Sequence, residues 1–222
     1  MTEAVFSGAR VGPGGVSPDS SKLTAVVNWQ IPQDTSHLEG FLGLMAYFRD
    51  LVKWYAALEK PLWDLLRVVD IPSGTKKAVY QCLMKAHKLK PYWKEEHMTT
   101  FINLKARLVS EPVLTTPQFD GTNFILTMDA CKDVFADVPS QKIKMTLPGG
   151  KEVTRLHPIG FESKQISLSK EKYKLFLLEF AALKYSLNKF SDIIYGYLVE
   201  VKMDCQASRD ILLSDKLSTT HV

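Results

Sequence analysis

The first half of the chain has hydrophobic residues at every third or fourth position, which is the spacing of amphipathic helices. Ser36 and Glu39 form a Ser-x-x-Glu capping box, and this motif predicts the start of a helix. The apolar stripe that accompanies it consists of Leu38, Phe41, Leu42, Met45 and Phe48. We expect further helical segments at 61–69, where Pro61 is at or near the start, at 75–90 and at 95–110.

The pattern changes to short β-rich runs from about Phe119 onwards. The run FILTM at 124–128 predicts a strand, and 145–163 predicts two strands around a Pro-Gly-Gly turn. A long helix is expected over 169–190, followed by a last strand over 196–204. The predicted fold class is therefore α+β or α/β, with a helical half followed by a half that contains a sheet and a covering helix.

Composition places only broad limits on function. Of the 222 residues, 45% are hydrophobic and 23% are charged, which is typical of a soluble globular protein. The three cysteines, at 82, 131 and 205, show neither disulfide nor zinc spacing, so we expect an intracellular protein, cytoplasmic or nuclear, that is not secreted. No apolar run approaches the ~18 residues of a membrane span, and we expect no membrane partner.

Positive charge is concentrated in one stretch of the sequence. The net charge is +4, and the segment from Asp70 to Lys94 carries six lysines and one acid, a balance of +5 that leaves −1 for the rest. These lysines are Lys76, Lys77, Lys85, Lys88, Lys90 and Lys94. Such a patch can hold phosphates through counterion release, so they are candidate nucleic-acid contacts. A solvated helix face is the alternative interpretation.

Three acidic residues occupy positions that folding could bring together. Asp129 ends the first strand of the second half, Asp204 ends the last strand, and Glu179 lies on the long helix. Strands joined through a covering helix are commonly parallel neighbours, so Asp129 and Asp204 should reach the same end of the sheet. A helical wheel puts Glu179 at the edge of an apolar arc. The arc consists of Tyr173, Phe176, Leu177, Phe180, Leu183, Leu187 and Phe190.

Clustered carboxylates repel one another and are costly to desolvate, and a bound cation relieves both problems. Oxygen ligands suit Mg²⁺ or Mn²⁺, and two such ions about 3.5–4 Å apart promote in-line phosphodiester cleavage. We therefore interpret Asp129, Glu179 and Asp204 as candidate catalytic residues and metal ligands. Solvated turn residues are the alternative, because acids are common at strand ends.

Several motifs, in the same order, resemble those of gypsy-like LTR retrotransposon Pol polyproteins. Residues 15–66 are similar to the family run of Asp-x-x-Lys, Trp-x-x-Pro, Phe-Leu-Gly-Leu, Tyr-Phe/Tyr-Arg and Pro-Leu. Residues 101–120 resemble the connector before RNase H, and FILTMDAC resembles the first RNase H strand. Tyr173 and Glu179 match a helix in which a tyrosine precedes the catalytic glutamate by six positions. The run YGYLVEVKMDCQAS at 195–208 resembles the strand that ends in the third catalytic acid.

The resemblance implies three regions: a palm-end or turn segment at 1–20, a helical thumb and connection region at 21–117, and an RNase H-like domain at 118–222. It implies an endonuclease site at Asp129, Glu179 and Asp204 that uses Mg²⁺ or Mn²⁺ to cleave the RNA strand of RNA–DNA hybrids. The implied partners are such hybrids or other nucleic acid, and the rest of a Pol polyprotein.

The sequence departs from the family pattern near the implied site. Asp137 and Pro139 stand where the family has a Gly-Ala-Val-Leu strand, and a proline belongs at a sheet edge or bulge, so we expect a weakened second strand. Cys131 and Cys205 replace the usual Ser and His, and the chain ends at Val222, before the family's fourth catalytic aspartate. A Tyr-x-Asp-Asp polymerase motif is absent. We therefore expect impaired RNase H activity, with an inactive nucleic-acid-binding remnant or a protein-interaction module as alternatives.

Overall fold

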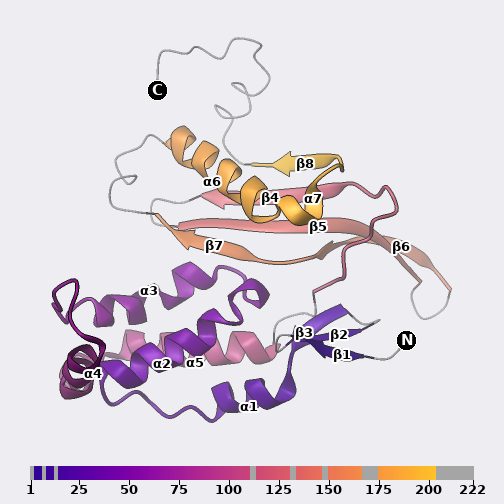
Figure 1. The fold of residues 1–222 in the computed structure, drawn as a ribbon. Helices are drawn as coiled ribbons and strands as arrows, with labels where there is room; N and C mark the ends of the chain where they lie inside the picture. The colour runs from indigo at the N-terminus through magenta and orange to yellow at the C-terminus, as the bar shows by residue number, and fades with distance from the viewer. Residues whose placement is uncertain are drawn as a thin grey trace, which may run out of the picture. The chain divides into compact units, whose positions relative to one another are not determined.

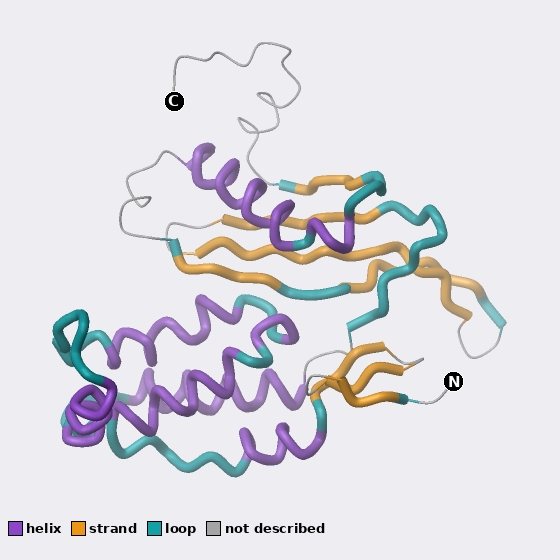
Figure 2. The backbone as a smooth tube through the Cα atoms, viewed as in Figure 1, coloured by secondary structure: helices purple, strands orange, loops and turns teal. Residues whose placement is uncertain are grey.

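The protein divides into two compact units, Met1–Val113 and Leu114–Val222, in a computed structural model. The structure describes residues 3–6, 9–12, 15–110, 114–130, 134–146, 150–166 and 175–203. Helices make up most of the first unit, whereas the second unit is built on a five-stranded sheet (Figure 2). None of the helices within these ranges is long and apolar enough to cross a membrane.

The beginning of the chain forms a small sheet, so the turn is wrong as one alternative of the palm-end or turn segment predicted for residues 1–20. Strands β1 (Ala4–Phe6), β2 (Ala9–Gly12) and β3 (Gly15–Pro18) pair antiparallel in sequence order. Val11 of β2 lies opposite Val16 of β3. Valine favours strands because its branched side chain fits a pleated surface, and this preference outweighed the glycine and proline content behind the prediction.

Helices account for the remainder of the first unit. They are α1 (Ser20–Val27), α2 (Thr35–Ala46), the short 3₁₀ helix η1 (Arg49–Leu51), α3 (Tyr55–Leu66), α4 (Lys77–Ala86) and α5 (Glu95–Ser110). The capping box predicted at Ser36 is wrong, because Asp34 is the N-cap of α2 and accepts the His37 backbone N–H at 2.9 Å. Pro61 lies inside α3 and does not begin it.

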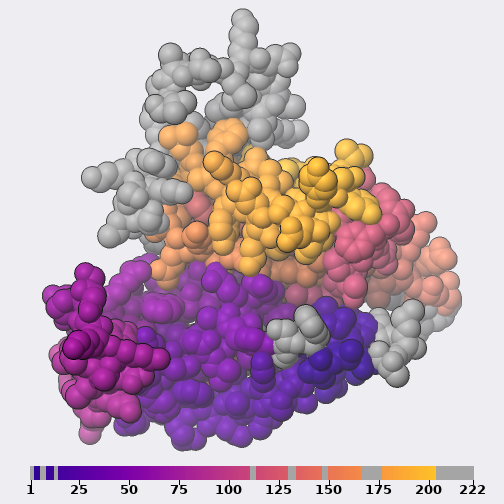
Figure 3. Space-filling model, in the orientation of Figure 1, coloured from indigo at the N-terminus to yellow at the C-terminus, as the bar shows by residue number. Residues whose placement is uncertain are grey.

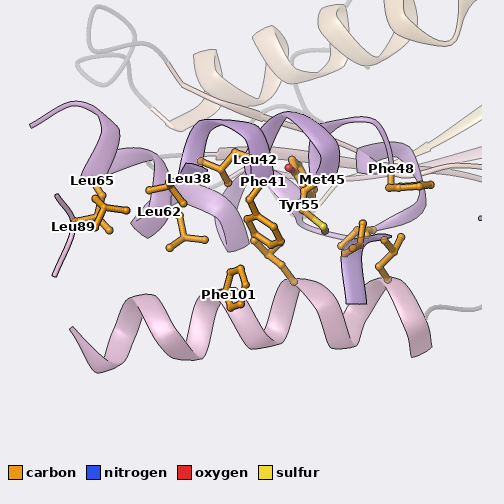
Figure 4. Packing of buried hydrophobic residues seen from close by; sticks show 14 residues of the cluster. Leu38, Phe41, Leu42, Met45, Phe48, Tyr55, Leu62, Leu65, Leu89 and Phe101 are labelled. Carbon is orange, nitrogen blue, oxygen red and sulfur yellow. The ribbon is translucent and has the colours of Figure 1, made fainter. Parts of the chain in front are cut away.

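The core of the first unit lies between α2, α3 and α5 (Figure 4). The predicted stripe on α2 is buried, and Phe41 meets Phe101 of α5 with ring centroids 4.5 Å apart. Leu62 of α3 and Leu89, which follows α4, complete this side of the cluster. Burying each such side chain contributes roughly 1.5–3 kcal/mol, so this apolar cluster accounts for most of the favourable packing in the unit.

A mixed sheet with helices packed on it forms the second unit (Figure 1). Its strands are β4 (Phe124–Ala130), β5 (Val134–Thr146), β6 (Glu152–Pro158), β7 (Glu162–Gln165) and β8 (Val199–Lys202). The order is β6-β5-β4-β8, and β7 also pairs with β5. The predicted hairpin around Pro-Gly-Gly is confirmed by the antiparallel pairing of β5 and β6. The predicted parallel pairing is confirmed between β4 and β8.

The second strand of this sheet runs without a break through Pro139, and the proline lies at a bulge, as expected for this residue; the weakening of the strand stays a prediction. The Pro139 carbonyl accepts the Ile159 N–H at 2.8 Å. The N–H and C=O of one strand residue point to the same side of the strand. The nitrogen of Pro139, which has no hydrogen to donate, therefore also faces residues 159–161. These three residues separate β6 from β7 and lie opposite only Val138 and Pro139. One extra residue on one strand makes a β-bulge, the place where a proline is tolerated.

Helix α6 (Leu175–Lys189) and the short α7 (Ser191–Ile194) pack on one face of the sheet (Figure 1). The buried side of α6 includes Leu178, Ala182 and Ser186. The predicted apolar arc is displaced from this side, since Leu177 and Leu187 are 38% and 37% exposed. The small side chains of Ala182 and Ser186 let the helix approach the strands closely, a packing requirement that a hydrophobicity pattern does not contain.

Candidate active site

The sheet and α6 bring two of the three predicted carboxylates to one end of the second unit. The predicted crossover geometry holds, because β4 and β8 are parallel and Thr127 lies opposite Lys202. Asp129 is the penultimate residue of β4, and Glu179 is in the N-terminal half of α6. The N-terminal end of α6 lies towards the end of the sheet to which β4 and β8 point (Figure 1). We refer to this end of the sheet as the rim.

Asp129 and Glu179 approach the rim from opposite faces of the sheet. Met128 packs in the same apolar cluster as Leu178 of α6, and successive strand residues alternate between faces, so Asp129 projects from the face away from α6. Asp129 is exposed to solvent. Glu179 is only 7% exposed, and its Oε2 has no hydrogen-bond partner among the described residues.

The third predicted carboxylate, Asp204, lies outside the described residues, as do Tyr173, Cys131 and Cys205. Within the described ranges, no group of three or more His, Cys, Asp or Glu side chains is arranged to hold a metal ion. The predicted set of Asp129, Glu179 and Asp204 therefore stays a prediction, with two of its members located at the rim.

A second pair of carboxylates, which the sequence did not identify as a pair, is buried beneath α6. Asp137 of β5 lies opposite Glu162 of β7, and the two residues are 0% and 2% exposed, respectively. Glu162 accepts the Tyr185 hydroxyl at 3.0 Å, and Lys189 Nζ lies 3.2 Å from Glu162 Oε2. Tyr185 and Lys189 are four residues apart on α6, a spacing that points both side chains the same way and was available as a signal in the sequence.

Asp137 lacks the cationic partner and the hydroxyl donor that Glu162 has in Lys189 and Tyr185 among the described residues. Neither of its carboxylate oxygens has a well-formed hydrogen bond among the described residues. Burial raises the pKa of Asp137 to about 7, the nearby Ser186 hydroxyl opposes this rise, and the Glu162 carboxylate adds to it. The Ser186 hydroxyl donates to the Ala182 carbonyl at 2.9 Å, so it is only partly available to Asp137. The charge that the sequence predicted at Asp137 is thus suppressed below about pH 7.

The six predicted lysine contacts are all exposed on the first unit. Lys76 is the N-cap of α4, Lys77 and Lys85 are within α4, and the other three follow in the segment before α5. Lys88 Nζ lies 3.2 Å from Asp34 Oδ2, and Lys94 Nζ lies 3.9 Å from Glu96 Oε1. Both pairs are exposed enough for solvent to screen them, so their lysines keep access to other anions.

Comparison with known proteins connects both units to one family of polyproteins. A family model described as the RNase H-like domain found in reverse transcriptase matches residues 93–201. The retrovirus-related Pol polyprotein from transposon 297 of Drosophila melanogaster is 28% identical over 207 residues, which cover 93% of this chain and 16% of that protein. The Pol polyprotein from transposon gypsy of the same fly is 27% identical over 192 residues, covering 86% of this chain and 16% of the relative.

A solved structure supports the same relationship at the level of the fold. The foamy viral protease-reverse transcriptase in complex with an RNA/DNA hybrid is similar with a TM-score of 0.68 and 18% identity, over 98% of this chain and 26% of that chain. The predicted fold class, a helical part followed by an RNase H-like mixed sheet with a covering helix, is confirmed. The chain is therefore related to retrotransposon Pol polyproteins, and residues 93–201 match the RNase H-like domain found in reverse transcriptase.

Proposed function

We propose that this chain acts as an RNase H-type nuclease that depends on divalent metal ions and cleaves the RNA strand of RNA–DNA hybrids. The observation that carries the proposal is the common rim. The parallel strands β4 and β8 finish at the same end of the sheet, and α6 begins there. In the sequence, Asp129 and Asp204 each come two residues after the paired Thr127 and Lys202, which favours Asp204 as the third member.

The two carboxylates at the rim have the donor chemistry that Mg²⁺ or Mn²⁺ prefers. Glu179 is buried and has one oxygen without a hydrogen-bond partner in the described part of the chain, an arrangement that a cation would satisfy. Asp129 is exposed, so it can reach a ligand that arrives from solvent. When bound, paired metal ions activate a water for attack on a phosphodiester and stabilise the leaving oxygen.

The chain's own residues would then have distinct tasks. Asp129, at the exposed end of β4, would contact metal and lie beside the scissile phosphate. Glu179 would hold its carboxylate in a fixed orientation, because the α6 backbone is packed on the sheet through Leu178 and Ala182. A rigid element positions a ligand more closely than a loop does, which matters because small displacements reduce catalysis strongly.

The direct test is cleavage of a labelled RNA–DNA hybrid by the full chain, with and without Mg²⁺ or Mn²⁺. Asp129→Asn keeps the shape of the side chain but removes its charge, and we expect it to lower cleavage by at least about 100-fold. Asp192→Asn is the matched control, because Asp192 is an exposed aspartate on α7, beyond the other end of α6. We expect this control to cleave at the rate of the unaltered chain.

Two outcomes would overturn the nuclease proposal. Cleavage that survives Asp129→Asn unchanged would place the chemistry elsewhere. Hybrid binding with steep salt dependence, but without metal-dependent cleavage, would identify a binding protein that retains the fold only. The six lysines at 76–94 are proposed phosphate contacts under both readings, and replacing one of them should reduce the salt slope of hybrid binding by about one.

A further inference from the structure

Helix α4 is attached to the first unit by one side only. The Tyr80 hydroxyl donates to Glu39 Oε1 at 2.9 Å, and Met84 is 3% exposed. Thr35 donates its hydroxyl to the Met84 carbonyl at 2.6 Å and its backbone N–H to the His87 carbonyl at 3.2 Å. These contacts hold one side of α4 against the start of α2. The opposite side of α4 therefore faces away from α2.

The outward side of α4 carries an apolar stripe. Val79 and Leu83 are 50% and 43% exposed, and Cys82 and Ala86 are also exposed. These four residues occupy positions i, i+3, i+4 and i+7, which is the spacing used when one helix lies in contact with another. Figure 3 shows the α4 segment at the surface of the first unit.

Lysines flank this stripe. At 100° per residue, Lys76 at the N-cap and Lys85 lie on either side of it, whereas Lys77 lies on the side of Met84; all three lysines are exposed. No aspartate or glutamate occurs between Ile71 and Lys94 in the sequence. The α4 face, defined as Val79, Cys82, Leu83 and Ala86 with Lys76 and Lys85 on either side, therefore presents an apolar centre with a lysine border.

We propose that the α4 face docks an acidic amphipathic helix of a partner protein. Its apolar side would cover Val79 and Leu83, and its glutamates and aspartates would pair with the lysine border. This inference uses none of the residues at the rim, but it shares Lys76 and Lys85 with the proposed phosphate contacts, so an acidic helix and a hybrid would compete for these lysines.

Charge and shape argue against two other occupants. A second copy of this chain would bring two lysine borders together, and like charges across an interface oppose association. A nucleic acid would satisfy the lysines through its phosphates, but a phosphate backbone gains little from covering Val79 and Leu83. Helix docking uses both parts of the α4 face, because such interfaces combine an apolar core with a charged rim.

The test uses the full chain and a fluorescent ~20-residue helical peptide with leucines at i, i+3, i+4 and i+7 and glutamates on its polar side. Its twin has lysines in place of the glutamates, and an RNA–DNA hybrid is the third probe. We expect the acidic peptide to bind, the basic twin not to bind, and binding to weaken as salt rises from ~50 to ~500 mM.

Matched variants decide which surface the peptide uses. The double variant Val79→Gln with Leu83→Gln, and separately Lys85→Glu, should each weaken peptide binding by at least about 10-fold. Ile102→Gln with Val109→Gln removes two similarly exposed apolar residues from α5, and Lys53→Glu reverses an exposed lysine outside the α4 face; both should bind as the unaltered chain does. Circular dichroism checks that each variant keeps its helices.

Four results would overturn the inference. The first is absence of acidic-peptide binding by a folded chain. The second is peptide binding that the Val79 and Leu83 substitutions leave unchanged. The third is hybrid binding that Lys85→Glu weakens while the acidic peptide does not bind, which would assign the lysines to nucleic acid alone. Self-association that Leu83→Gln abolishes, without peptide binding, would assign the α4 face to a second copy.

Discussion

Asp137 on β5 and Glu162 on β7 lie directly opposite each other beneath α6, and only Glu162 has a cationic partner among the described residues. Two neighbouring carboxylates without full compensation favour a protonated state for one of them. Glu162 has Lys189 and Tyr185, so the proton is expected on Asp137. This asymmetry makes the stability of the second unit depend on pH between about 4 and 7.

Asp137→Asn should remove most of that sensitivity. Burial raises the pKa of Asp137 from 3.8 to about 7, so the folded state favours the protonated acid. Below about pH 4 the acid is protonated in both states, and its effect on stability is absent. As pH rises to about 7 the unfolded chain releases the proton first, and stability falls. At pH 8 the variant should be more stable by on the order of 4 kcal/mol.

The measurement for Asp137→Asn must follow the second unit. All four tryptophans, at 29, 54, 63 and 93, are in the first unit, so tryptophan fluorescence would report the wrong part of the chain. Amide hydrogen exchange in β4 and β5, measured at several pH values, reports the second unit directly. Identical pH profiles for the variant and the unaltered chain would show that Asp137 is not the group that titrates.

Lys189→Met should destabilise the second unit. Glu162 would keep a buried side chain but lose its cation, which leaves an uncompensated charge. Since 38% of the Lys189 side chain is exposed and solvent screens the pair, we expect a cost of about 1–3 kcal/mol. Lys184→Met, at an exposed position on the same helix, should change stability by less than about 0.5 kcal/mol.

Pro139→Ala and Val138→Pro should have very different effects although the residues are adjacent. The N–H that Pro139→Ala restores would face the break between β6 and β7. We therefore expect the free energy of unfolding to change by only about 0.4–1 kcal/mol. Val138 pairs with Thr127 of β4, and its N–H points the other way. Val138→Pro should therefore break a β4–β5 hydrogen bond and cost at least about 1–3 kcal/mol. Similar unfolding midpoints for both variants in urea would contradict this assignment of the bulge.

His97 should make the first unit less stable in mild acid. Its Nδ1 accepts the Lys94 backbone N–H at 2.9 Å, and burial lowers the pKa of the ring from its ordinary value of 6.5. Above pH 6.5 the ring is neutral in the folded and the unfolded chain, and the hydrogen bond from Lys94 to His97 contributes fully to stability. As pH falls below this value, the unfolded chain takes up the proton first, so stability declines until the folded ring also titrates.

His97→Gln tests this dependence, because glutamine does not titrate. Compared with His97→Gln, the unaltered chain should lose about 0.5–2 kcal/mol of unfolding free energy between about pH 7 and pH 5. This is the usual contribution of a hydrogen bond that caps a helix. Tryptophan fluorescence is suitable here, since Trp93 lies beside His97 with ring centroids 5.8 Å apart. A parallel decline in both proteins would show that another group is responsible.

Local pattern was sufficient for most of the elements. The stripe from Leu38 to Phe48, the hairpin around Pro-Gly-Gly and the long helix with Glu179 all follow from the spacing of apolar residues and from turn chemistry. Those properties depend on neighbours within a few residues, so the sequence carries them directly. Where local signals competed, as between Asp34 and Ser36 at the start of α2, the choice depended on the backbone of the completed helix.

The family relationship and the candidate carboxylates could also be identified from the sequence, because the motifs are contiguous and ordered. Tertiary structure decided what the sequence could not: that Pro139 faces a bulge, that α6 packs through Leu178, Ala182 and Ser186, and that Asp137 meets Glu162 out of contact with water. Each of these depends on which strand or helix lies alongside, and that neighbour comes from a distant part of the chain. Burial and hydrogen-bond direction are properties of the packed sheet, and they exist only after the strands have paired.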